Sequence, residues 1–207
     1  MSTSGPQGTR IELPGLHSPA AGFDQPFEML AACHERVQRS LDLLARLLDH
    51  LQRRSASHPA EVVDADARGA ATDVGRYFDL AAPQHHRDEE THVIPRLQAS
   101  GQAPLQAAAA QMLADHRAIE AVWVRLGPML AALAGAGADA ASRPDLPALA
   151  AAAGEFIALH ARHVPLEDQL AFPAVLATMD AQTQAAMGRE MAARRRAPAP
   201  APDHRTG

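Results

Sequence analysis

The sequence is poor in the residues from which several classes of functional site are built. One cysteine, Cys33, in 207 residues excludes an internal disulfide, a cysteine-rich zinc site and an iron–sulfur cluster, because each of these needs several thiolates. Lysine is absent, and no basic stripe is interleaved with aromatic residues, so we expect no nucleic-acid partner. No apolar leader opens the chain and no run of about 18 apolar residues occurs, so we expect a cytoplasmic protein that does not enter a membrane.

Aromatic residues are also scarce, whereas histidine is abundant. One tryptophan, one tyrosine and five phenylalanines stand against eleven histidines. A chain of this length is large enough to bury an apolar core without disulfides. Because thiolates are excluded, any metal chemistry must use histidine and carboxylate ligands.

Proline and glycine divide the chain into three parts. Residues 1–26 are rich in both and predict an irregular N-terminal arm. Residues 27–178 are rich in Ala, Leu, Arg, Gln and Glu, which are good helix formers, and predict an all-α domain. Residues 179–207 predict a short helix near 180–193, followed by a disordered tail that begins at Arg194.

Two segments place a histidine in an otherwise apolar stripe with helical spacing. In both, the stripe advances by three or four residues, which is the pattern of a bundle helix that buries one face. The stripes are Leu30, His34, Val37, Leu41, Leu44, Leu48 and Leu51, and Met112, His116, Ile119, Trp123, Leu126, Leu130 and Leu133. His34 and His116 are 82 residues apart, and both are predicted to face the interior.

Two further segments repeat each other with an offset of 78 residues. They are HHRDEETHVIPRL (85–97) and HVPLEDQLAFPAV (163–175). Each has a histidine, a glutamate four residues later, and a proline six residues after that glutamate. Together, the four segments predict an up-down four-helix bundle made from a duplicated αα-hairpin, with helix breaks near 55–70, 100–104 and 135–147.

The repeats predict a buried cluster of histidine and glutamate. Residues i and i+4 lie on one face of a helix, so each His-x3-Glu pair directs an imidazole and a carboxylate to one place. The converging residues are His34, His85, Glu89, His116, His163 and Glu167. Such groups are costly in an apolar core unless cations neutralise them, and the donor set suits iron or manganese, with zinc also compatible.

At these residues the sequence resembles the hemerythrin-like (HHE) family of four-helix proteins over roughly residues 27–178. The resemblance implies a non-haem centre of two iron ions held by these six residues, with the two glutamates and an oxo or hydroxo group as bridges. It also implies binding or sensing of dioxygen or nitric oxide, or a part in iron–sulfur cluster repair. Oxygen carriers have a histidine where Glu120 stands and an aspartate where Glu167 stands, so the resemblance is to the bacterial type with four histidines and two glutamates.

Other polar residues near the cluster receive separate expectations. We expect His86 on the outer face of its helix. In the alternative register, His86 and Glu90 would replace His85 and Glu89 as the inward pair. We expect His92 and His160 to pack beside the site. Cys33 is expected to be a small buried residue and Tyr77 a packing residue. Four carboxylates either accept hydrogen bonds from ligand imidazoles or are solvated: Glu90, Asp115, Glu120 and Asp168.

Three functions are compatible with this pattern. The leading one is binding or sensing of a diatomic molecule, without turnover. An oxidase of the ferritin type needs two Glu-x2-His motifs, and only Glu89-x2-His92 is present, although slow reduction of peroxide or nitric oxide stays open. The third is a structural bundle that binds zinc.

Overall fold

The computed structural model describes residues 22–58, 61–136 and 144–196, and within these ranges every regular element is a helix. In chain order the helices are α1 (Pro26–Ser57), α2 (Ala65–Leu80), α3 (Ala82–His92), α4 (Ile94–Ala99), α5 (Ala103–Ala134), α6 (Leu146–Leu166), the π-helical turn η1 (Glu167–Ala171), α7 (Phe172–Leu176) and α8 (Ala181–Arg196). No described helix is long and apolar enough to cross a membrane. Most of the predicted N-terminal arm and the end of the predicted tail lie outside the described residues.

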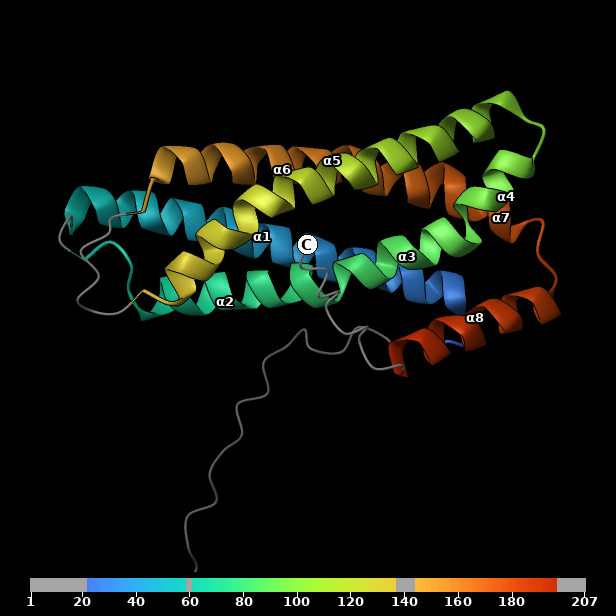
Figure 1. Ribbon diagram of the computed structural model, residues 1–207, viewed down its shortest axis with the longest axis horizontal. Coiled ribbons are helices and arrows are strands. Elements are labelled where there is room, and N and C mark those ends of the chain that lie inside the picture. The colour runs from blue at the N-terminus through green and yellow to red at the C-terminus, as the bar shows by residue number, and fades with distance from the viewer. Residues whose placement is uncertain (1–21, 59–60, 137–143, 197–207) are drawn as a thin grey trace, which may run out of the picture.

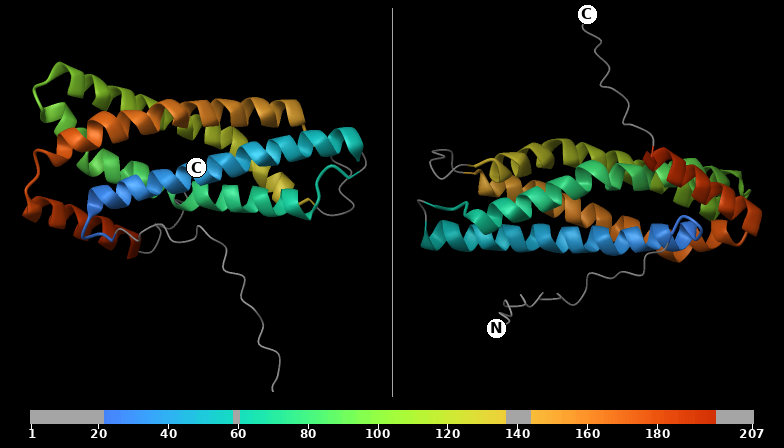
Figure 2. Two further views of the ribbon diagram at one scale, coloured as in Figure 1. Left: turned by 180° about the vertical axis from the view of Figure 1, so that it is seen from behind. Right: turned by 90° about the horizontal axis from the view of Figure 1, so that it is seen from below.

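The helices form the predicted up-down four-helix bundle. Its four rods are α1, then α2 with α3 and α4, then α5, and then α6 with η1 and α7 (Figure 1). Each rod packs against the next in chain order, and α6 closes the ring against α1 (Figure 2). The prediction of an all-α bundle is therefore confirmed.

Side-chain caps and glycine define where the rods begin and turn. The Asp64 carboxylate accepts from the Ala67 backbone N–H at 2.9 Å, and Asp145 caps α6 in the same way through Ala148 at 3.0 Å. Such caps satisfy backbone N–H groups that have no partner inside the helix. Gly101, with φ of +70°, adopts the left-handed conformation in the turn from α4 to α5.

The repeated prolines occupy equivalent places in the second and fourth rods. Pro95 lies at the start of α4 and Pro173 at the start of α7, each where a missing backbone N–H is tolerated. Pro165 lies inside α6 and is followed directly by η1. A proline removes one helical hydrogen bond, and a π-turn is a local adjustment often found at functional sites, so the backbone deviates from α-helix where Glu167 begins η1.

The C-terminal helix is longer than predicted and packs against the bundle. α8 lies beside α1 and α3 at one end of the molecule (Figure 1), and its Met187 and Met191 are buried. The prediction that the disordered tail begins at Arg194 is wrong, because α8 continues to Arg196. Arg194 and Arg195 both pair with Asp88, a carboxylate on α3 with no exposed surface, and a buried carboxylate needs such partners.

Candidate metal centre

A polar layer separates two apolar cores inside the bundle. The first core lies along α1, α2, α5 and α6 and contains Leu44 and Phe156. The second lies at the end covered by α8 and contains Leu30 and Met112. On α1, His34 stands between Leu30 and Val37, and on α5, His116 stands between Met112 and Ile119, so each imidazole lies where one core gives way to the other.

All six residues selected from the sequence come together in this layer and are buried. They form two groups of four whose ligand atoms lie within 4.8 Å of one another. One group is His34, His85, Glu89 and Glu167, and the other is Glu89, His116, His163 and Glu167. The two glutamates belong to both groups.

Each glutamate directs one oxygen to each group. Glu89 Oε1 lies 3.2 Å from His85 Nε2, and its Oε2 lies 3.2 Å from His116 Nε2. Glu167 Oε2 lies 3.0 Å from His34 Nε2, and its Oε1 lies 2.8 Å from His163 Nε2. Two adjacent ligands bonded to one ion at about 2.1 Å and at right angles are themselves about 3 Å apart. The spacing of the donors is therefore compatible with ligands of a shared cation.

The donor atoms lack the hydrogen-bond partners that buried polar atoms normally have. Both carboxylate oxygens of Glu89, both of Glu167, and the Nε2 atoms of His116 and His163 are buried without a hydrogen bond to any described residue. Buried polar atoms are almost always satisfied, and exceptions call for an explanation such as a bound ion. Four anionic or neutral oxygens facing imidazole nitrogens are also a chemically suitable donor set for a divalent cation. The residues present thus fit a metal centre.

Two carboxylates outside the cluster orient imidazoles, which decides for them between the two alternatives that the sequence left open. His34 Nδ1 donates to Asp168 at 2.8 Å and His116 Nδ1 donates to Glu90 at 2.9 Å. A proton held on Nδ1 leaves Nε2 as the atom that faces the centre, and such a bond increases the basicity of a ligand imidazole.

The other two carboxylates, Asp115 and Glu120, do not hydrogen-bond to an imidazole of the cluster. Asp115 Oδ2 is 3.7 Å from His163 Nδ1, longer than a hydrogen bond, and this buried carboxylate instead accepts from Arg162. Glu120 is exposed and lines a surface pocket.

The cluster distributes protons unequally among its members. Burial opposes protonation of His34 and His116, but the adjacent Glu167 carboxylate outweighs it and raises the pKa of His34 to about 9 and that of His116 to about 10. Burial and the neighbouring His34 charge lower the pKa of His85 to about 3. Burial and the charge of Glu167 raise the pKa of Glu89, whereas the adjacent imidazoles outweigh burial and lower the pKa of Glu167. A cation would therefore compete with protons on His34, His116 and Glu89.

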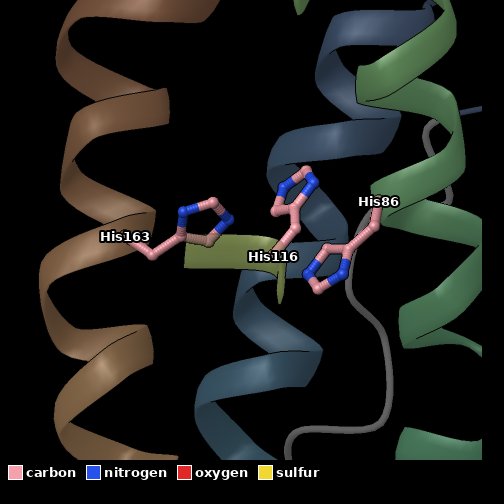
Figure 3. A group of neighbouring side chains, drawn as sticks. All are labelled: His86, His116 and His163. Carbon is pink, nitrogen blue, oxygen red and sulfur yellow. The ribbon is translucent and has the colours of Figure 1, made fainter. Parts of the chain in front are cut away.

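His86 lies inside the bundle, and the prediction of an outward position is wrong. Its ring stacks on the His116 ring, with centroids 4.0 Å apart and planes 9° apart, and its centroid is 5.9 Å from that of His163. Figure 3 shows the three rings gathered between α3, α5 and α6. A residue 100° around the helix from His85 faces the neighbouring rod rather than solvent, since every rod of the bundle has two neighbours. The three rings form a third group with metal-ligand spacing.

The remaining residues singled out by sequence have structural partners. His160 is buried against Phe78 and Phe156 and its Nδ1 donates to the Phe156 carbonyl at 2.9 Å, which confirms a packing role. His92 lies 2.6 Å from Glu190 of α8 and does not join the cluster. Cys33 is half-buried, and its carbonyl accepts from the Tyr77 hydroxyl at 3.3 Å.

Comparisons with known proteins agree with the geometry. A protein of Haemophilus influenzae described as uncharacterized is 29% identical over 175 residues, which cover 84% of this chain and 92% of that protein. The hemerythrin HHE cation binding domain matches residues 25–175. This range contains all six cluster residues and the whole bundle except the last residue of α7. With most of the chain matched and the buried histidine and glutamate cluster at its centre, the protein belongs to the hemerythrin HHE cation-binding family.

Proposed function

We propose that the bundle binds two iron ions, one in each half of the cluster, with Glu89 and Glu167 as bridging ligands. The observation that carries the proposal is the division of each carboxylate between the two halves, with donor separations of 2.8–3.2 Å. His34 and His85 would complete one half, and His116 and His163 the other.

The donor set favours iron or manganese over the hard ions that prefer oxygen alone. Imidazole suits iron, zinc and copper, and carboxylate suits manganese and magnesium, so a mixed set with no thiolate fits iron and manganese best. Zinc is compatible with the same donors but usually takes four ligands in a closed structural site. Two nitrogens and two oxygens per ion would leave open coordination positions on an octahedral ion. A purely structural metal site has no use for such positions.

The function proposed for this site is reversible binding or sensing of dioxygen or nitric oxide. Iron supplies open coordination positions and two readily interconverted oxidation states. The chain supplies the burial of the cluster, the bridging glutamates, and the Asp168 and Glu90 hydrogen bonds that hold two imidazoles in place. We propose binding rather than turnover.

Two further functions have less support. The ferritin-type oxidase motif is not assembled, since His92 pairs with α8 rather than with Glu89. Iron–sulfur cluster repair would rest on the bundle alone, since Cys33 is half-buried and is the one cysteine in the chain.

Metal analysis followed by gas titration tests the proposal. Protein from iron-supplemented cells should contain close to two iron ions per chain. After anaerobic reduction, dioxygen or nitric oxide should produce visible charge-transfer bands that reverse when the gas is removed. One zinc per chain with no iron would refute the diiron proposal. Two iron ions with a spectrum unchanged by both gases would refute the sensing role alone.

A further inference from the structure

A pocket opens on the bundle surface beside the His116 half of the cluster. It lies between α2, α3 and α5, with α6 at its base, and has a volume of about 250 Å³. Its floor is formed by buried side chains, among them Phe78, Ala82, Ile119 and Phe156, while Arg87 and Glu120 at its edge are exposed. The pocket therefore combines apolar and aromatic walls with polar groups of His86, Glu90 and His116, and it is charged at its mouth.

The pocket concentrates aromatic residues, which are scarce in this chain. Three of the seven Phe, Tyr and Trp residues, Phe78, Trp123 and Phe156, line it. Their ring centroids are 4.8–5.3 Å apart, and the Trp123 indole N–H donates to Asp79 at 2.9 Å. The rings are thus held rigidly by one another and by this hydrogen bond, which is the condition for a preformed site.

His86 provides a polar group on the wall of the pocket. It lines the pocket from α3, and among the described residues it makes ring contacts but no hydrogen bond. An imidazole nitrogen can donate or accept one hydrogen bond. A ligand inside the pocket would therefore meet aromatic rings on one side and a free hydrogen-bonding group on the other.

We propose that this pocket binds a small aromatic molecule of one or two fused rings that carries one hydrogen-bonding group directed to His86. A dry cavity of about 150 Å³ lined by apolar side chains is large enough for benzene, so about 250 Å³ accommodates a substituted ring or two fused rings. A diatomic gas would fill only a small part of this volume. The three aromatic side chains supply flat surfaces, against which rings pack edge-to-face or offset.

The pocket also adjoins the proposed metal centre, because His116 lines it and His86 stacks on His116. A ligand bound there would lie next to the half formed by His116 and His163. Binding in the pocket nevertheless needs no metal, so it can be tested separately from the proposed function.

Phenol and toluene are suitable probes, and Trp123 is a built-in reporter because it is the one tryptophan of the chain. Titration of the purified full chain with either probe should change its tryptophan fluorescence with saturation at one molecule per chain. We expect a Kd of about 1 mM or lower, the range open to ligands of this size. The titration should give the same result before and after removal of metal with a chelator.

A filled pocket provides the matched test. Ala82→Phe places a ring in the pocket and should weaken binding of both probes at least 10-fold, whereas Ala81→Phe, at the exposed neighbouring position, should leave it unchanged. His86→Leu should retain toluene binding and reduce the preference for phenol over toluene about five-fold, the effect of one hydrogen bond.

Three results would overturn the proposal. They are an absence of saturable binding, an equal loss in both alanine variants, and phenol binding that appears only in iron-loaded protein with a new charge-transfer band, which would place phenol on the metal. If Ala82→Phe does not fold, the indole N–H resonance of Trp123 in the wild-type protein decides the matter. That resonance should shift with saturation on addition of toluene, and an unshifted resonance would refute the pocket site.

Discussion

Replacement of Glu89 and Glu167, the two glutamates that belong to both halves of the cluster, by leucine should make the metal-free protein more stable and end its response to metal. In the wild-type protein, six buried donor atoms of the cluster have no hydrogen bond to a described residue. An unsatisfied buried polar atom costs about 1–3 kcal/mol, which is a large part of the whole stability of a domain, about 5–15 kcal/mol. Sharing of protons among His34, His116 and Glu89 reduces this cost without removing it.

The size of the effect follows from the linkage between binding and folding. Metal at about 1,000 times its Kd stabilises the folded state by about 4 kcal/mol. For a chain of this length, 1 kcal/mol shifts Tm by about 2–4 °C. We therefore expect chelation to lower the Tm of the wild-type protein by about 8–16 °C. In the double variant Glu89→Leu/Glu167→Leu, apolar side chains replace buried charges, a change that is often stabilising by about 1–4 kcal/mol.

Thermal unfolding followed by circular dichroism measures both effects. Samples should be metal-free or supplied with ferrous iron, manganese or zinc, with magnesium as a control ion. The double variant should melt above the metal-free wild-type protein and should not respond to any ion. Glu155→Leu, a matched exchange at an exposed position of α6, should leave the metal response intact. A metal-free wild-type protein that melts as high as the metal-loaded one, or above the double variant, would refute the reasoning.

Three further predictions concern individual residues. His85→Ala should abolish loading of one half of the centre and leave at most one ion per chain by metal analysis, whereas His86→Ala should retain both ions; the reverse order would mean that the two residues exchange roles. Asp88→Ala should destabilise the docking of α8 by about 2–4 kcal/mol. This loss is somewhat smaller than that from breaking a fully buried ion pair, because Arg194 and Arg195 are 18% and 25% exposed. Limited proteolysis of the Asp88→Ala variant should then release α8. The control Glu190→Gln, at a residue 45% exposed, should cost less than about 1 kcal/mol. Equal proteolysis of the two variants would contradict the role of Asp88 in holding α8. Burial lowers the pKa of His160 from 6.5 to about 4, so the unfolded chain takes up a proton before the folded one does, and about 3 kcal/mol of stability should be lost as the pH falls from 6.5 to 4. His160→Phe should show a smaller loss in urea titrations over that range, and identical slopes for the two proteins would disprove the contribution.

Most of the fold and all six cluster residues were predictable from local spacing. A helix repeats every 3.6 residues, so a histidine in an apolar stripe, such as His34, must face the same way as its neighbours. The offset of 78 residues between His85 and His163 placed two similar helices in one bundle, because a duplicated hairpin packs against its copy.

The error at His86, and the lack of any expectation for Asp88, arose where a side chain meets a neighbouring helix instead of the bundle axis. His86 and Asp88 are adjacent in sequence to His85 and Glu89 but point about 100° away. His86 faces α5, and Asp88 faces α8. Helical periodicity ranks positions by their distance from one apolar stripe and cannot identify which neighbour covers the side of a helix.

The sequence by itself determined the all-helical architecture, the identity of the six converging residues and the need for a cation, since spacing and residue chemistry are local properties. The tertiary structure alone decided that Arg194 and Arg195 from α8 neutralise Asp88, and that three scarce aromatic residues meet His86 around one pocket. These features join residues from different helices, some more than 100 positions apart. Their distances depend on how the rods pack, which no local pattern records.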